Sequence, residues 1–260
     1  VIRLIVMIIG IPIFLKQGLE YAVAFIVLSN IISEVTSILV LFFFLPKHFS
    51  VKKEDFRPHK NSIRDVFGIS LPTTASRLIG NIGYFFEPII LTFFLLKTGY
   101  NNDFIITEYG ILNGYVMPLL LLPSFFTLAI SQALIPVVSK SYSNHNIDYT
   151  KKKIKQAIFF SLLIGIPATL IFLFIPEIPL KLIYNTTEGI NYIKVLAPIC
   201  LLHYIQAPLS STLQAMGKAK DALKGTLVGI ILRTSALFIF SSLKIGMWGL
   251  VIGTSINIIY

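Results

Sequence analysis

The chain has 260 residues, of which 55% are hydrophobic and only 13% are charged. Soluble domains carry about 25% charged residues, so this composition excludes an ordinary water-soluble protein. The 22 Lys and Arg residues outnumber the 12 Asp and Glu residues, but they lie between long apolar runs, which indicates membrane topology rather than nucleic-acid binding. The single cysteine, Cys200, excludes a disulfide framework and a cysteine-based zinc site.

Apolar runs long enough to cross a bilayer recur along the chain. Because a hydrocarbon core of about 30 Å requires about 20 residues of helix, the sequence predicts eight spans, of which the first and last continue beyond the chain. In chain order they cover residues 1–15, 20–45, 63–96, 108–139, 156–175, 192–216, 221–243 and 246–260. Transmembrane strands alternate apolar and polar residues, and these runs do not. The predicted fold class is therefore all-α and polytopic.

Basic residues divide the connections between the spans into two sets. The connections at 46–65, at 140–155 and around Gly217 hold fourteen Lys and Arg residues, whereas the intervening connections hold five. Cytoplasmic loops are enriched in Lys and Arg, so we expect these three connections inside the cell and the loops near Lys16, Asn101, Asn185 and Lys244 outside.

The longest basic connection predicts the domain organisation. We expect residues 46–62 to form a cytoplasmic linker in a multi-pass protein of the cell membrane, because this stretch mixes charge with proline and has no apolar periodicity. Residues 1–45 are then the last two helices of an N-terminal lobe. Residues 63–260 form a C-terminal lobe of six helices, the last of them truncated.

Several segments resemble a known superfamily of transporters. They are DVFGISLPTTASRL at 65–78, GILNGYVMP at 110–118, ALIPVVS at 133–139 and LQAMGKAK at 213–220, together with Ser33 and Glu34. They are similar to the polysaccharide-export flippases of the multidrug/oligosaccharidyl-lipid/polysaccharide (MOP) superfamily, and within it to the stage V sporulation protein B group. The resemblance implies a fragment of a two-lobed, MATE-like transporter of twelve or more helices, which moves a lipid-linked sugar to the outer leaflet.

Charged residues inside the predicted spans are the candidate site residues, because a charge at mid-membrane costs at least about 2.5–3.5 kcal/mol. Arg3 and Glu34 are expected at matching depth on neighbouring helices. They either form a buried ion pair, or Arg3 binds phosphate and Glu34 serves as a proton site or orients Arg3. Arg77 follows Pro72 and is expected either to line a cavity or to donate hydrogen bonds to neighbouring carbonyls.

Arg233 differs from these residues because the sequence offers it no obvious carboxylate. Its depth-matched position on the next helix is near Asn257, so we expect its guanidinium to face water or an anionic ligand. Glu87 is expected about one turn from the outer surface, either as a solvated carboxylate or as a coupling site. His203, beside Gln206, is expected to be a hydrogen-bonded structural histidine or a group that titrates near neutral pH.

Arginine suits a phosphate-bearing cargo because its guanidinium is permanently charged and donates bidentate hydrogen bonds. We therefore expect a flippase that moves a lipid-linked phosphate oligosaccharide, or a cell-wall or polysaccharide precursor, by alternating access. Arg3, Arg77 and Arg233 are the predicted substrate-binding residues, and Glu34 is the predicted coupling or ion-pair residue. The expected partners are the lipid-linked sugar phosphate, membrane lipids and a coupling ion, H⁺ or Na⁺. No cofactor, metal or nucleic acid is expected.

Two other functions stay open from the sequence. A cation-coupled multidrug or toxin antiporter of the same fold would carry more acid than base in its cavities, because its substrates are cationic. A membrane glycosyltransferase acting on lipid-linked sugars would need a catalytic acid or base, commonly on a sizeable outer loop. The predicted outer loops near Asn101 and Asn185 are short and poorly equipped for this chemistry, so we do not expect an enzyme.

Overall fold

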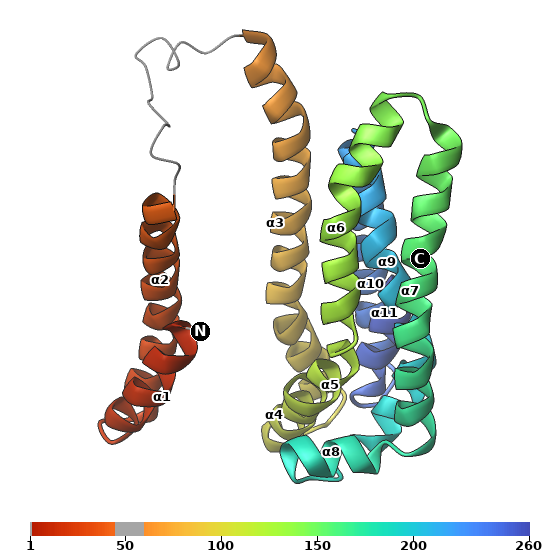
Figure 1. The fold of residues 1–260 in the computed structure, drawn as a ribbon. Helices are drawn as coiled ribbons and strands as arrows, with labels where there is room; N and C mark the ends of the chain where they lie inside the picture. Colours follow the sequence, from red (N-terminus) through yellow and green to blue (C-terminus); the bar gives the residue numbers. More distant parts are fainter. Residues whose placement is uncertain (1, 45–59) are drawn as a thin grey trace. The chain divides into compact units, whose positions relative to one another are not determined.

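Helices form the regular structure of the residues that the computed structural model describes, 2–44 and 60–260 (Figure 1). The chain divides into two units, Val1–His59 and Lys60–Tyr260. Most of the predicted linker at 46–62 lies outside the described residues.

The first unit contains a hairpin of two apolar helices, α1 (Ile2–Leu15) and α2 (Leu19–Phe44), which pack against each other. The turn between them needs Gly18, whose φ of 146° is disfavoured for residues with a side chain. Near the turn the rings of Phe14 and Phe25 stack with centroids 4.6 Å apart. Gly10 lets the helices approach, because a Cβ atom there would overlap the Phe25 ring.

The second unit is a bundle whose main helices run roughly antiparallel (Figure 1). Its elements are α3 (Lys60–Lys97), α4 (Asn102–Ile111), the π-helical turn η2 (Leu112–Val116), α5 (Met117–Leu121), α6 (Ser124–Ser143), α7 (Ile147–Phe174), α8 (Glu177–Tyr184), α9 (Ile190–Ala215), α10 (Ala219–Ser241) and α11 (Trp248–Ile259). Helix α10 packs against α3 and α11, and α9 packs against α6 and α7. Contacts of α9 with α11 and α10 join these two groups of three helices.

The distribution of side chains in the bundle is that of a membrane protein. Large apolar residues such as Phe125, Phe159 and Leu163 are exposed, whereas small hydroxyl residues such as Thr127 and Ser161 are buried. In water this arrangement would be unfavourable, but lipid is the preferred surrounding for the apolar outer faces.

Six helices among the described residues are long and apolar enough to cross a membrane. They are Leu19–Phe44, Val66–Lys97, Asn102–Leu121, Ile147–Phe174, Ile190–Ala215 and Ala219–Ser241. The shorter apolar helices Arg3–Leu15 and Trp248–Ile259 flank them in the sequence. The protein is therefore a multi-pass membrane protein, as the sequence predicts.

The predicted span at 108–139 differs from the structure, which contains no single straight helix there. Helix α4 begins earlier, where the Asn101 side chain accepts a hydrogen bond from the Phe104 amide. The π-helical turn η2 then interrupts the helix, and a break at Pro123 separates α5 from α6. Proline removes a backbone donor and clashes with the preceding turn, which accounts for the break. Next to it, the Tyr204 hydroxyl donates to the Leu120 carbonyl at 2.6 Å.

Candidate functional site

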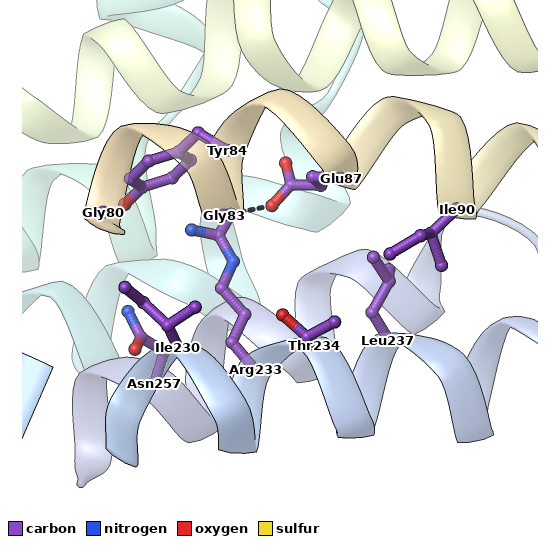
Figure 2. Close-up of a pocket in the computed structure, with 10 residues that line it drawn as sticks. All are labelled: Gly80, Gly83, Tyr84, Glu87, Ile90, Ile230, Arg233, Thr234, Leu237 and Asn257. Atoms are coloured by element: carbon purple, nitrogen blue, oxygen red, sulfur yellow. Dashed lines mark ion pairs between the residues drawn. The ribbon is translucent and has the colours of Figure 1, made fainter. Parts of the chain in front are cut away.

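Two opposite charges lie buried between α3 and α10 (Figure 2). The Arg233 guanidinium of α10 forms an ion pair with the Glu87 carboxylate of α3, and the two side chains are only 12% and 6% exposed. Because removing charges from water is costly, such a pair persists in an apolar bundle only when the partners satisfy each other. The pair is therefore the strongest electrostatic feature of the described bundle.

Small residues bring α3 and α10 close enough for this contact. A Cβ atom on Gly83 would lie 3.0 Å from Cγ2 of Ile230, so a larger residue there would push the helices apart. Farther along the same interface, the Ser76 hydroxyl donates to the Thr226 hydroxyl at 2.8 Å. Close packing of small residues is a common way to join helices in a membrane.

The guanidinium has further neighbours besides Glu87. Its Cζ atom lies 4.3 Å from the centroid of the Tyr84 ring, which is a cation–π geometry. One terminal nitrogen donates to Oγ1 of Thr254 at 3.5 Å. The Nε atom is buried and has no hydrogen-bond partner within the described part of the chain. A guanidinium has five N–H donors, so Arg233 keeps donor capacity for another group.

Polar space adjoins the ion pair. A cavity of about 30 Å³ is lined by Tyr84, Glu87 and Arg233, which Figure 2 shows turned toward one another, and it has room for one or two waters. A larger pocket of about 260 Å³ shares Tyr84 and Asn257 with this cavity. It continues between α3, α9, α10 and α11 along side chains that include Gln206, Ser210, Asp221 and Thr226. The ion pair thus lines a small cavity that adjoins a larger pocket with several polar side chains.

Two expectations from the sequence are wrong at this site. Arg233 does have a carboxylate partner, because Glu87 neutralises it. Glu87 is buried rather than close to a surface, since α3 continues for ten residues beyond it to Lys97. The expectation that Asn257 lies at the depth of Arg233 agrees with the structure, in which both residues line the same cavity.

A signal in the sequence could have revealed the pair. Glu87 lies ten residues before the end of α3, and Arg233 lies eight residues before the end of α10. At 1.5 Å per residue the two positions differ in depth by only about 3 Å. Counting back from the predicted outer ends therefore places them at one level, although it does not show that α3 and α10 are neighbours.

The other predicted site residues lie apart from this pair. Arg77 is an exposed side chain on α3, ten residues before Glu87. Arg3 on α1 and Glu34 on α2 are exposed side chains of the first unit, and they do not form the ion pair considered from the sequence. His203 is hydrogen-bonded, as expected, because its Nδ1 atom lies 3.0 Å from Oε1 of Gln206.

Comparison with protein families identifies the chain. The model of the family described as polysaccharide biosynthesis protein matches residues 1–142, which is more than half of the sequence. The chain belongs to this family. The MatE family model matches residues 109–239 and overlaps the end of the first match. The resemblance to the MOP superfamily expected from the sequence is thereby confirmed.

Curated proteins with similar sequences include transporters and sporulation proteins. Stage V sporulation protein B of Bacillus subtilis (strain 168) is 35% identical over 248 residues, which cover 93% of this chain and 48% of that protein. The probable lipid II flippase MurJ of Rickettsia prowazekii (strain Madrid E) is 31% identical over 154 residues, which cover 55% of this chain and 29% of that protein. The chain spans about half the length of the first of these relatives.

Solved structures establish the fold. A crystal structure of MATE in complex with MaL6 matches with a TM-score of 0.73 at 18% identity, over 99% of this chain and 58% of that chain. A MOP superfamily transporter from Pyrococcus furiosus matches with a TM-score of 0.69 at 19% identity, over 99% of this chain and 58% of that chain. The predicted all-α, MATE-like transporter fold is therefore confirmed.

Proposed function

We propose that this chain is part of a flippase that moves a lipid-linked, phosphate-bearing oligosaccharide, or a cell-wall or polysaccharide precursor, across the cytoplasmic membrane by alternating access. Membership of the polysaccharide biosynthesis protein family supports this function, as does the similarity to a probable lipid II flippase. The observation that carries the proposal is the presence of two intramembrane guanidiniums, Arg77 and Arg233, on the packed helices α3 and α10.

Arg77 is the more accessible of the two proposed phosphate ligands. Its side chain is exposed and has no carboxylate partner among the described residues. A guanidinium in this state offers a full set of donors to phosphate oxygens, in the bidentate geometry that arginine provides. We assign Arg77 the first contact with the phosphate of the cargo.

Arg233 binds phosphate in this proposal by exchanging partners. In the empty transporter Glu87 neutralises the guanidinium, so no unpaired charge is left in the bundle. A phosphate entering through the adjoining pocket replaces the carboxylate at Arg233, and the released Glu87 carboxylate takes up a proton, so that neither partner is left with an unpaired buried charge. Direct displacement without a replacement would cost several kcal/mol, because it would leave a buried charge uncompensated.

The remaining roles belong to the first unit and to the surroundings of the transporter. Arg3 is proposed as a third phosphate ligand, and Glu34 as a coupling or ion-pair residue for H⁺ or Na⁺. The other proposed partners are membrane lipids, and the basic linker at 46–62 is proposed to lie in the cytoplasm, where the basic loops of membrane proteins are enriched.

A cation-coupled multidrug antiporter is the second candidate function. The MatE family match and the similarity to MATE structures favour it. Within the described spans, the buried carboxylate of Glu87 is the group that a cationic substrate would approach, but Arg233 already neutralises it. The ion pair is therefore neutral as a whole, and it is the guanidinium of Arg77, without a carboxylate partner among the described residues, that favours an anionic cargo.

Substitution of Arg77 in the full-length transporter tests the proposal. Proteoliposomes are loaded with a fluorescent lipid-linked oligosaccharide diphosphate, and its appearance in the outer leaflet is measured. We expect Arg77→Ala to slow translocation about 10- to 100-fold, because a charge-assisted hydrogen bond contributes about 1.5–3 kcal/mol. Arg77→Lys should retain part of the rate, since the charge stays while the bidentate geometry is lost.

A basic residue outside the proposed site provides the control. Lys194 is an exposed residue near the start of α9, and Lys194→Ala should translocate at the normal rate. A normal rate for properly inserted Arg77→Ala would overturn the role of Arg77. Export of a cationic drug without any translocation of the lipid-linked sugar would refute the flippase function and support the antiporter function.

A further inference from the structure

A second large pocket lies at the far end of the bundle from the start of α3. It is formed by α4, the connection between α8 and α9, and the beginnings of α9 and α11, and its volume is about 560 Å³. In Figure 1, α4 and α8 lie together at this end, with α8 crossing the ends of the other helices. The loops near Asn101, Asn185 and Lys244 also belong to this end, which the sequence predicts to face the outside.

We propose that this pocket binds the saccharide units of the cargo on the outer side of the membrane. The inference rests on the proposed function and extends it, because it assigns the sugar part of the cargo to a place separate from the phosphate-binding arginines. The volume lies within the range of about 300–1,000 Å³ that is usual for small-molecule sites. The polar and aromatic residues that carry the argument are Thr107, Glu108, Glu188, Asn191, Tyr192 and Trp248.

Aromatic rings form one side of the pocket. The rings of Tyr192 and Trp248 meet in an edge-to-face arrangement with centroids 5.0 Å apart, which fixes both side chains. The faces of aromatic rings are electron-rich, and the C–H groups on one side of a sugar ring are weakly positive, so the two surfaces attract each other. Both aromatic residues are only partly buried, so they are placed to contact a ligand in the pocket.

Hydrogen-bond acceptors lie beside these rings. The Tyr192 hydroxyl donates to Oε2 of Glu108 at 2.5 Å, which holds the carboxylate at the pocket wall. A carboxylate has two oxygens and about four acceptor positions, so Glu108 keeps capacity for sugar hydroxyl groups. The exposed Asn191 amide and Thr107 hydroxyl can each donate and accept. The pocket therefore offers acceptors together with groups that both donate and accept, and these complement the hydroxyl and acetamido groups of a saccharide.

The backbone that closes the pocket is tightly constrained at Gly189. This residue has φ of 83°, in the left-handed region that glycine adopts readily. A Cβ atom there would lie 2.5 Å from Cγ2 of Val116 and 3.0 Å from Cγ2 of Ile111. The connection before α9 therefore rests directly on α4 and η2, and it places Glu188 and Asn191 at the same opening.

The negative charge of the pocket lining disfavours binding of the phosphate part of the cargo there. Its lining contains two carboxylates, those of Glu108 and Glu188, and no Lys or Arg. Phosphate placed there would be repelled at short range. A neutral saccharide has no such penalty, and hydrogen bonds from its hydroxyl groups to a carboxylate are stronger than those to neutral acceptors.

Direct binding of a free saccharide tests the inference. The full-length transporter in nanodiscs is titrated with tetra-N-acetylchitotetraose, and binding is followed by saturation-transfer NMR. We expect Glu108→Gln to weaken binding at least fivefold, because the amide keeps an acceptor for Tyr192 but loses the charge. Asn191→Ala should weaken binding about threefold. Glu177→Gln removes an exposed carboxylate on α8 outside the pocket, and this variant should bind the tetrasaccharide as tightly as the unmodified protein.

Three results would overturn the saccharide site. The first is that the unmodified transporter shows no saturation transfer to the tetrasaccharide. The second is that both pocket variants bind the tetrasaccharide as well as the unmodified protein does. The third is that a charged competitor displaces the tetrasaccharide at equal or lower concentration. Displacement by tetramethylammonium would show that the pocket binds cations, and displacement by inorganic pyrophosphate would show that it binds anions. Thermal melting of each variant shows that it is folded.

The same preparations separate this inference from the proposed function. Translocation of the lipid-linked sugar without binding of the free tetrasaccharide would refute the saccharide site and support the flippase function. Binding of the tetrasaccharide that depends on Glu108, without any translocation of the lipid-linked sugar, would refute the flippase function and support the saccharide site.

Discussion

The ion pair between Arg233 and Glu87 makes a quantitative prediction about stability. Glu87→Gln removes the negative charge that compensates Arg233, although the new amide oxygen can still accept a hydrogen bond, and Arg233→Met leaves the Glu87 charge unpaired. Both side chains are at most 12% exposed, so solvent screens little of the effect. Removing one partner of a buried pair typically costs about 3–5 kcal/mol.

The expected shift in melting temperature follows from the size of the unit. The second unit, Lys60–Tyr260, has about 200 residues, for which 1 kcal/mol corresponds to about 2–4 °C. Each single substitution should therefore lower the midpoint by roughly 6–20 °C. The double variant Glu87→Gln/Arg233→Met should be more stable than either single variant, because it leaves no unpaired charge and buried pairs can be replaced by neutral residues at little cost.

Thermal unfolding of the purified full-length protein, followed by intrinsic fluorescence, measures these shifts. The four proteins of the cycle give the coupling free energy between the two positions. Glu177→Gln removes an exposed carboxylate on α8 and serves as the control, with an expected change within about 0.5 kcal/mol. The reasoning is refuted if both single variants melt within about 2 °C of the unmodified protein, or if the double variant shows the sum of the single effects.

Two further predictions concern helix packing in each unit. Tyr204→Phe should cost about 1–3 kcal/mol, because it leaves the Leu120 carbonyl without its buried 2.6 Å hydrogen bond; a melting midpoint unchanged from that of the unmodified protein would contradict this. Gly10→Val should destabilise the contact of α1 with α2 by about 1–3 kcal/mol, because the new side chain overlaps the Phe25 ring. The same change at Gly68, which has open space around it, is the control, and equal proteolytic sensitivity of the two variants would argue against the packing explanation.

The membrane-spanning architecture could be predicted from the sequence with few errors. Long apolar runs specify helices in lipid, because every backbone group must be hydrogen-bonded within the protein. The structure nevertheless places helix ends where local chemistry dictates. Helix α7 begins at Ile147, before the predicted span at 156–175, because the Asn146 side chain accepts from the Tyr149 amide and polar residues extend the helix.

The candidate site was only partly predictable. Arg233 was identified because a charge in an apolar run is conspicuous, and Asn257 was placed correctly from its depth. The expected place of Glu87 near the outer surface is wrong even though the predicted span 63–96 ends within one residue of α3, because Glu87 lies ten residues before Lys97 and is buried against α10. The pocket around Glu108 and Trp248 has no signal in the sequence, because its residues come from separate segments and are individually ordinary.

The amino-acid sequence by itself determined that this protein is a helical, multi-pass membrane protein of the MOP type. Hydrophobic length and local composition suffice for the membrane-spanning helices, because the bilayer imposes the same requirement on every span. The MOP type rests instead on the resemblance carried by segments such as LQAMGKAK at 213–220. Only the tertiary structure decided which charges meet. The partner of Arg233 depends on how α10 is rotated and on which helix packs against it, and these are set by the small residues that let α3 approach closely.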